Sequence, residues 1–242
     1  MGDDTGPRIL VWDCETTNLN ASFGVLLAIA YKWVGKPKVY VPTILDYAKR
    51  NSMLDDKHLV SDFLDAYNQA DYSVAHYGSK FDLPYINTKC LKHGLGPPSP
   101  IPLIDTCVVA WKNFKLHSNR LAAWLEYLDC KHEKKAMRTD DWLNAAHGCP
   151  KAMRAVKDRA KFDVLGLEEV FLQMRPWIKE PSRHLFVEQK VNLTCVACGS
   201  DHLQSRGWSV TKTRRYQRFQ CQDCGKWQRE TASDAEVKAA LV

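Results

Sequence analysis

The sequence of 242 residues predicts an α/β protein: a mixed sheet flanked by helices, followed by a small metal-bound module. Two observations support this fold class. Short apolar, β-favouring segments come first and then alternate with helical patterns, which is typical of helices packed on a sheet. Four of the nine cysteines form two C-x-x-C pairs after residue 190, whereas the other five are scattered. Hydrophobic residues make up 45% and charged residues 26% of the chain, as expected of a globular protein.

Strands are predicted where apolar residues run without helical spacing. The first covers residues 8–13, in which the run ILVW leads to an aspartate. The next two, 24–34 and 37–42, are close enough in sequence to form an antiparallel meander. A short strand follows at 72–78, and the segment 103–111 begins extended and becomes helical.

Helices are predicted from apolar residues at three- and four-residue spacings, with characteristic residues at their ends. They cover residues 56–70, 81–95, 118–130, 140–148 and 150–177. Gly94 or Gly96 ends the second helix, and Pro150 starts the last one. Ser118 is the expected N-cap of the third.

The composition changes near residues 180–190, which predicts a domain boundary. The polar stretch KEPSRH, 179–184, is typical of a linker. We therefore expect one domain over 1–182 and a second over 190–232, followed by a loose helical tail in ASDAEVKAALV.

Several features indicate a protein of a reducing compartment. The first residues, MGDDTGPR, are polar, so we expect no secretion signal. The longest apolar run, FGVLLAIAY, is too short to cross a bilayer. An odd number of cysteines with four in paired spacing fits a metal site better than a disulfide framework. We therefore expect a cytoplasmic protein with no membrane partner. Separately, the net charge of +6 permits binding to nucleic acid.

Four carboxylates form the candidate active site. Asp13 and Glu15 are one residue apart at the end of the first strand, so their side chains point to the same face. Asp82 lies at a strand-to-helix junction, and Asp163 lies on a helix among apolar residues. Because clustered carboxylates repel one another, a cation is needed to hold them together. Oxygen ligands favour Mg²⁺ or Mn²⁺, and a pair of such ions suits phosphodiester hydrolysis.

Each of these carboxylates also has a structural interpretation. Asp13 and Glu15 could form a strand-end turn, and Asp82 could be a helix N-cap. Asp163 could form a buried ion pair with Arg120 or a lysine. Other nearby groups are expected to be structural, with Asp105 as a cap, His76 as a packed side chain, and Glu168 and Glu169 as solvated or ion-paired groups.

The order of three motifs resembles a known family. D-x-E at 13–15 is followed by H-x-x-x-x-F-D-x-P at 76–84 and by D-V-x-x-L-E-E at 163–169. Over roughly residues 8–178 the chain resembles the DnaQ-like (DEDD) exonucleases of the ribonuclease H-like superfamily, and most of all the YprB-like branch with its phage-type members. The resemblance implies a mixed five-stranded sheet, hydrolysis from a 3′ end, and Asp13, Glu15, Asp82 and Asp163 as metal ligands. A phage origin would place the protein in the host cytoplasm.

The chain departs from this pattern near the last motif. Relatives have a Tyr four residues, or a His five residues, before the last Asp, where this chain has Arg159 and Asp158. Arginine cannot act as a base near neutral pH, although it can stabilise negative charge. Catalysis could therefore be slow or use another residue, such as His76 or His147. Tyr77 also replaces an Asn that many relatives have.

The paired cysteines predict a second metal site. The motifs CVAC and CQDC, which contain Cys195, Cys198, Cys221 and Cys224, are separated by 22 residues, 199–220. This spacing is typical of a zinc ribbon in which a β-hairpin joins two cysteine turns, with redox or iron–sulfur use as the alternatives. So short a segment needs the structural Zn²⁺ in order to fold.

Basic and aromatic residues between the cysteine pairs suggest contact with nucleic acid. Residues 191–230 contain seven Lys or Arg and three Asp or Glu. The sequence RRYQRFQC is expected to form a strand with cations on one side and aromatics on the other, suited to phosphates and bases. The alternative is a solvated hairpin whose aromatics pack on the ribbon. The candidate binding residues are Arg206, Trp208, Lys212, Arg214, Arg215, Tyr216 and Arg218.

Together these features predict a two-metal-ion 3′–5′ exonuclease that acts on nucleic acid, with DNA favoured over RNA. Two alternatives remain open: a catalytically weak or inactive nuclease fold that only binds nucleic acid, and a structure-specific endonuclease. The sequence gives no oligomeric state.

Overall fold

A computed structural model describes residues 7–47, 55–132, 137–178, 194–210, 214–230 and 235–236. The chain divides into two compact units. The large unit comprises Arg8–Met174, and the small unit comprises Met1–Pro7 and Arg175–Val242. The predicted linker at 179–184 lies outside the described residues.

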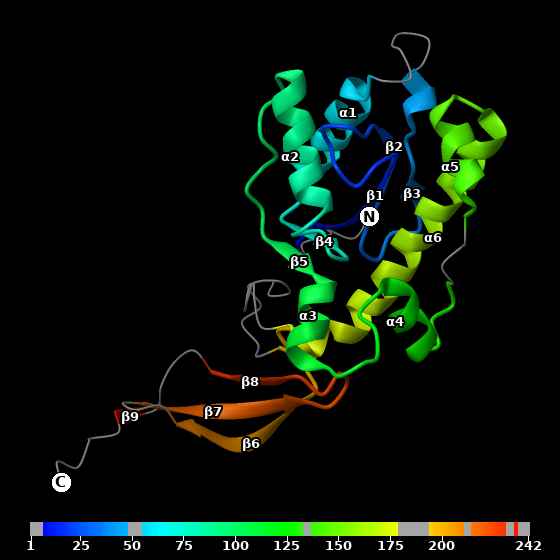
Figure 1. The fold of residues 1–242 in the computed structure, drawn as a ribbon. Coiled ribbons are helices and arrows are strands. Elements are labelled where there is room, and N and C mark those ends of the chain that lie inside the picture. Colours follow the sequence, from blue (N-terminus) through cyan, green and yellow to red (C-terminus); the bar gives the residue numbers. More distant parts are fainter. Residues whose placement is uncertain are drawn as a thin grey trace. The chain divides into compact units, whose positions relative to one another are not determined.

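The large unit is built on a mixed five-stranded sheet, as predicted (Figure 1). Its strands are β1 (Ile9–Thr16), β2 (Leu26–Trp33), β3 (Val39–Tyr40), β4 (Tyr72–Ala75) and β5 (Leu103–Asp105). They lie in the order β3-β2-β1-β4-β5. β1 pairs antiparallel with β2 and parallel with β4, so it lies at the centre of the sheet. A central strand is covered on both faces, which explains why β1 begins with an unbroken apolar run.

Six α-helices in the described part of the large unit surround this sheet. They are α1 (Lys57–Tyr67), α2 (Asp82–His93), α3 (Thr106–Asn113), α4 (Leu121–Tyr127), α5 (Thr139–Ala146) and α6 (Pro150–Met174). A 3₁₀ turn, η1 (Ile44–Tyr47), precedes α1, and a second, η2 (Arg175–Trp177), follows α6. No helix among the described residues is long and apolar enough to span a membrane.

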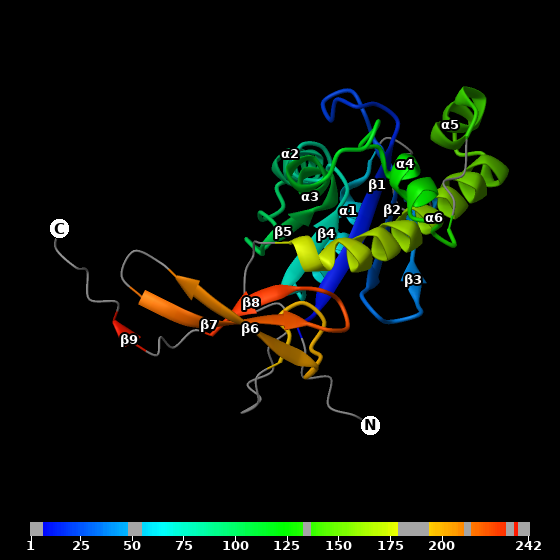
Figure 2. The ribbon, with the colours of Figure 1, turned by 90° about the horizontal axis from the view of Figure 1, so that it is seen from below.

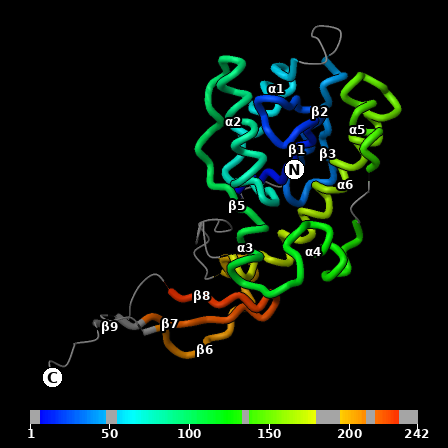
Figure 3. Tube along the Cα trace, in the orientation of Figure 1, coloured from blue at the N-terminus to red at the C-terminus, as the bar shows by residue number. Residues whose placement is uncertain are grey.

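The two faces of β1 are covered by different helices. Trp12 points toward α1, where its ring lies 4.9 Å from the ring of Phe63 and 5.7 Å from that of Tyr67. Because side chains alternate along a strand, Asp13 and Glu15 point toward the opposite face. The long helix α6 packs on β1 and β2 there, as Figure 2 shows from below. The trace in Figure 3 shows that β1 and α6, near opposite ends of the large unit's sequence, lie side by side.

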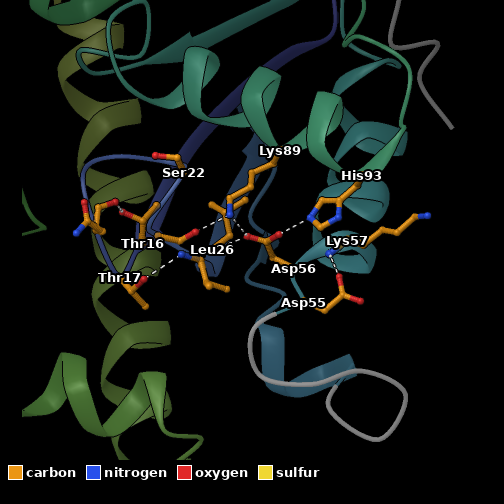
Figure 4. Close-up of polar contacts among 12 residues, drawn as sticks. Thr16, Thr17, Ser22, Leu26, Asp55, Asp56, Lys57, Lys89 and His93 are labelled. Atoms are coloured by element: carbon orange, nitrogen blue, oxygen red, sulfur yellow. Dashed lines mark hydrogen bonds and ion pairs between the residues drawn. The ribbon is translucent and has the colours of Figure 1, made fainter.

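A buried polar network joins the loop after β1 to helices α1 and α2 (Figure 4). Lys89 of α2 donates to the carbonyl of Gly24, at 2.5 Å, and forms an ion pair with Asp56. Asp56 also accepts from the backbone N–H of Leu26, at 2.9 Å, and contacts His93 at 2.6 Å. The network therefore fixes the point where the chain enters β2.

Three predicted details of secondary structure are wrong or incomplete. The helix expected over 118–130 is shorter, because the chain turns through a left-handed residue, Asp129, just after α4. Ser118 does not cap it: the N-cap is Arg120, whose N–H donates to the Ser118 hydroxyl. In the expected helical tail, the two described residues, Ala235 and Glu236, are extended and pair with the backbone of Arg214 and Arg215.

The small unit contains a four-stranded antiparallel sheet. Its strands are β6 (Leu203–Val210), β7 (Arg214–Cys221), β8 (Trp227–Arg229) and β9 (Ala235–Glu236). The hairpin of β6 and β7 lies between the cysteine pairs, as predicted. Among the described residues its buried core is small: Cys195, Ala197 and Cys221, with Leu203 and Cys224 packed against them.

Candidate active site

Three of the predicted carboxylates come together between β1 and α6. One oxygen of each of Asp13, Glu15 and Asp163 lies within 4.8 Å of the others. Asp13 and Glu15 share a face of β1, and α6 brings Asp163 across that face. Glu15 and Asp163 are buried, with 7% and 2% of their surface exposed, while Asp13 is partly exposed. Carboxylate oxygens at this spacing fit a divalent cation such as Mg²⁺ or Mn²⁺.

Asp82 lies beside this group and is not one of the three. It is the first residue of α2, and its carboxylate accepts from the backbone N–H of Cys14, at 3.1 Å. Burial raises the pKa of Asp82 well above its ordinary value, and the charge of Asp13 raises it further. The hydrogen bond from Cys14, which lies between Asp13 and Glu15 in β1, places Asp82 next to these two residues. The N-cap interpretation of Asp82 is wrong, since the N-cap position is Phe81 and no side chain caps this helix.

Cys14 lies between the two acidic residues of β1 and is buried. Burial raises the pKa of its thiol well above the ordinary value, and the charges of Asp82 and Asp13 add to this shift. The thiol therefore stays protonated near neutral pH and is unsuited to act as a nucleophile.

Arg159 is the cation closest to the acidic group among the described ion pairs. Its Nε donates to Glu15 Oε1, at 3.0 Å, and its Nη2 lies 3.8 Å from Asp163 Oδ2. The guanidinium also lies over the ring of Trp142 in α5, 5.7 Å from the ring centre. The contact with Glu15 is not predictable from local sequence, whereas the i,i+4 spacing of Arg159 and Asp163 on one helix is a usable signal for their ion pair. The alternative interpretation of Asp163 was a buried ion pair with Arg120 or a lysine, and the structure has Arg159 in that role.

The loop before α2 is organised by Asp105. Its carboxylate accepts from the N–H of Tyr77, at 2.9 Å, and from the N–H of Ser79, at 3.0 Å. It also caps α3 by accepting from the N–H of Cys107 and Val108, which confirms its predicted capping role. Tyr77 has φ of 65°, a conformation that is strained for a bulky residue. Asp105 therefore stabilises a strained turn that leads directly to Asp82.

His76 is packed in the structure. Its Nδ1 lies 2.9 Å from the Thr106 hydroxyl, and its Nε2 lies 2.8 Å from the carbonyl of Asn119. Since the carbonyl can only accept, Nε2 carries a proton. Both ring nitrogens are thus engaged in structural hydrogen bonds, as predicted for a packed side chain. Of the two glutamates after Asp163, Glu168 forms an ion pair with Lys32, and Glu169 accepts from the N–H of Lys131 and lies 2.5 Å from His132 Nδ1.

The four paired cysteines form a second cluster in the small unit. Their sulfur atoms all lie within 4.8 Å of one another. Cys195 and Cys224 are 3.6 Å apart, and Cys198 and Cys221 are 3.7 Å apart. Ligands about 2.3 Å from a tetrahedral zinc ion are about 3.8 Å from each other. This geometry fits a zinc ribbon.

Burial raises the pKa of the Cys221 thiol, but backbone N–H groups of Cys224 and Asp223 and the neighbouring thiols lower it to about 7 overall. A thiol with this pKa readily loses its proton to solvent, and the resulting thiolate can bind a metal ion.

The predicted division of β7 into a cationic and an aromatic side is wrong. Alternate residues of a strand share a face, so Tyr216 and Arg218 lie on the same side of β7. Arg218 donates twice to the carbonyl of Arg206, both at 3.1 Å, and lies 5.0 Å from the ring centre of Trp227. Arg206 and Trp208 are exposed. The side chains of Arg214 and Arg215, and all of Lys212, lie outside the described residues.

Comparison with known proteins agrees with this fold. Residues 10–139 match the protein family described as the RNase_H superfamily, which is more than half of the chain. The chain belongs to the RNase H superfamily. The match includes Asp13, Glu15 and Asp82, whereas Asp163 lies beyond it and joins the site through the fold alone. No curated protein matches the chain. An RNase H fold with clustered carboxylates supports a metal-dependent nuclease in general.

Proposed function

We propose that this chain is a two-metal-ion nuclease that removes nucleotides from a 3′ end, with DNA as its preferred substrate. The convergence of Asp13, Glu15 and Asp163, with Asp82 beside them, is the observation that supports this proposal most. The motif order D-x-E, F-D-x-P and D-V-x-x-L-E-E favours the DEDD exonuclease type within the superfamily.

The chain supplies ligands and positioning for the reaction. Asp13, Glu15, Asp82 and Asp163 would hold the divalent ions. When bound, such ions stabilise negative charge on phosphate oxygens and make water a stronger acid. The Cys14 N–H orients Asp82. Gly78 lies beside this ligand: a Cβ there would make an ordinary contact with Asp82 Oδ2, at 3.7 Å, but would lie 2.3 Å from the Cβ of Ala75.

The decisive experiment compares labelled oligonucleotides incubated with Mn²⁺ or Mg²⁺. Matched single- and double-stranded DNA and RNA carry a label at the 5′ or the 3′ end, and a closed circular DNA is included. A 3′–5′ exonuclease shortens 5′-labelled DNA stepwise and leaves the circle intact. Cleavage of the circle would instead indicate an endonuclease.

Variants connect this activity to the acidic group. Asp13→Asn and Asp163→Asn should each lower the rate by at least about a hundredfold, because an amide binds a divalent ion more weakly than a carboxylate does. Asp65→Asn changes an exposed carboxylate of α1 and should leave the rate unchanged. If wild-type protein degrades no substrate under any condition, the proposal is wrong.

One observation favours a second candidate function, a nucleic-acid-binding protein with little or no catalysis. The position of the water-orienting residue is taken by Arg159, which contacts Glu15, and Asp158 beside it is exposed. Such a protein would retard labelled oligonucleotides in a gel without shortening them. It would do so even when Asp13 and Asp163 are replaced.

We also propose that the zinc ribbon contacts the substrate through the exposed Arg206 and Trp208. Arginine pairs with phosphates, and tryptophan stacks on bases. Replacing both by alanine should weaken binding of single-stranded DNA in fluorescence anisotropy. The exposed Asp201→Asn is a control that should not weaken it.

A further inference from the structure

The contacts of Arg159 with the acidic group suggest a role in metal loading. Its guanidinium touches two of the three clustered carboxylates, Glu15 and Asp163. Its side chain is only 17% exposed, and the ring of Trp142 covers it. A guanidinium keeps its positive charge at every physiological pH. It therefore supplies a permanent positive charge where three carboxylates repel one another.

Divalent ions and Arg159 need the same carboxylates. A metal ion bound by Glu15 and Asp163 would share these two carboxylates with the guanidinium, which contacts one oxygen of each. Two cations so close together also repel each other. Loading of the site then weakens the charge-assisted hydrogen bond of Arg159 to Glu15, and hydrogen bonds of this kind are among the stronger ones in proteins.

We infer that Arg159 is a built-in counter-cation that competes with the divalent ions and couples their binding to that of the nucleic acid. This inference rests on the proposed function. Once displaced, the guanidinium remains tethered to α6 one turn from Asp163. A substrate phosphate there offers it new acceptor oxygens. Metal ion and nucleic acid should then strengthen each other's binding, because each favours the displaced arrangement.

Binding of Mn²⁺ to the zinc-loaded, full-length protein tests the competition. Titration calorimetry should show about tenfold tighter binding to Arg159→Gln than to wild type, equivalent to about 1.4 kcal/mol. Arg159→Lys keeps the charge but loses the forked donor, so its affinity should lie between the two. Arg154→Gln removes the same charge from an exposed position on α6 and should match wild type. Thermal unfolding without Mn²⁺ should show a lower Tm for Arg159→Gln, since Glu15 and Asp163 lose their cation.

The coupling is tested with a phosphorothioate oligonucleotide that resists cleavage. It should tighten Mn²⁺ binding to wild-type protein severalfold, and to Arg159→Gln much less. The inference fails if Arg159→Gln binds Mn²⁺ no more tightly than Arg154→Gln, or if the oligonucleotide has equal effects on both.

These outcomes differ from a failure of the proposed function. If Asp13→Asn and Asp163→Asn leave Mn²⁺ binding unchanged, the acidic group is not the metal site at all. If they abolish binding while Arg159→Gln has no effect, the metal site stands and only the role of Arg159 is wrong.

Discussion

Lys89 and Asp56 form an ion pair in the interior of the large unit, with Nζ and Oδ2 3.0 Å apart and neither side chain exposed. The pair is embedded in hydrogen bonds to Gly24, Leu26 and His93. It connects α1 and α2 to the loop that follows the acidic residues of β1. Burying two charges is costly, so the geometry of this network matters for stability.

Removing the lysine should strongly destabilise the protein. Lys89→Met leaves Asp56 charged and buried without its cation, which costs about 3–5 kcal/mol. Urea unfolding measures this loss. Lys92→Met, an exposed position on the same helix, should change stability by less than about 0.5 kcal/mol. If the two variants lose the same amount of unfolding free energy, the buried ion pair is not important for stability.

The same network predicts a pH dependence of stability. Burial raises the pKa of Asp56, but hydrogen bonds from Leu26, His93 and Lys89 outweigh it, and the net pKa lies below the ordinary value. A carboxyl with a lowered pKa stabilises the fold above its unfolded pKa of about 3.9 and loses this contribution as the pH falls further. The difference in unfolding free energy between wild type and Asp56→Asn should therefore be large at pH 7 and shrink below about pH 4. A difference that grows on acidification would contradict this assignment.

Gly78 should not tolerate a side chain. A Cβ at this position would lie 2.3 Å from the Cβ of Ala75, which cannot move away without its strand. Gly78→Ala should destabilise the protein by about 1–3 kcal/mol in thermal or urea unfolding, and should also lower nuclease activity because Asp82 is adjacent. Gly96→Ala meets nothing within 4 Å and should be neutral or stabilising by up to about 1 kcal/mol. If Gly78→Ala is as stable as Gly96→Ala, the predicted clash with Ala75 is refuted.

Asp105 should be important for stability although it is not a predicted ligand. Asp105→Ala removes the acceptor for the N–H groups of Tyr77 and Ser79 and uncaps α3, with an expected loss of about 2 kcal/mol or more. Asp105→Asn should recover part of this loss, because its amide oxygen still accepts. Chemical denaturation of both variants measures the effect. If alanine and asparagine are equally harmless, the capping role is unimportant.

Metal removal should unfold the small unit and spare the large one. The described core of the small unit is too small to hold the sheet without the metal ion. After treatment with a strong chelator, amides of β6 to β8 should lose protection in hydrogen exchange, while those of β1 keep it. Cys221→Ser should lower the bound zinc measured by mass spectrometry, and the exposed Cys149→Ser should not. Retained protection in β6 to β8 after full metal loss would contradict this.

The sequence predicted the features that depend on residues close together in the chain. An apolar run followed by D-x-E gives a central strand with two carboxylates on one face, because the period of a strand is two. The spacing of CVAC and CQDC gives a four-sulfur cluster on either side of a hairpin. The α/β class follows from the alternation of these local patterns. In β7 the same period of two puts Tyr216 and Arg218 on one face, so the predicted division into a cationic and an aromatic face is wrong.

Only the tertiary structure decided which distant groups meet. Arg159 and Glu15 are 144 residues apart in sequence, and their hydrogen bond exists because α6 crosses the acidic face of β1. The same crossing brings Asp163 to Asp13, and the packing of α2 on α1 brings Lys89 to Asp56. Side-chain partners of this kind are set by which helix covers which face of the sheet. Local sequence patterns define the apolar and polar faces of each helix and strand. The long-range packing of the core decides which of these faces contact each other.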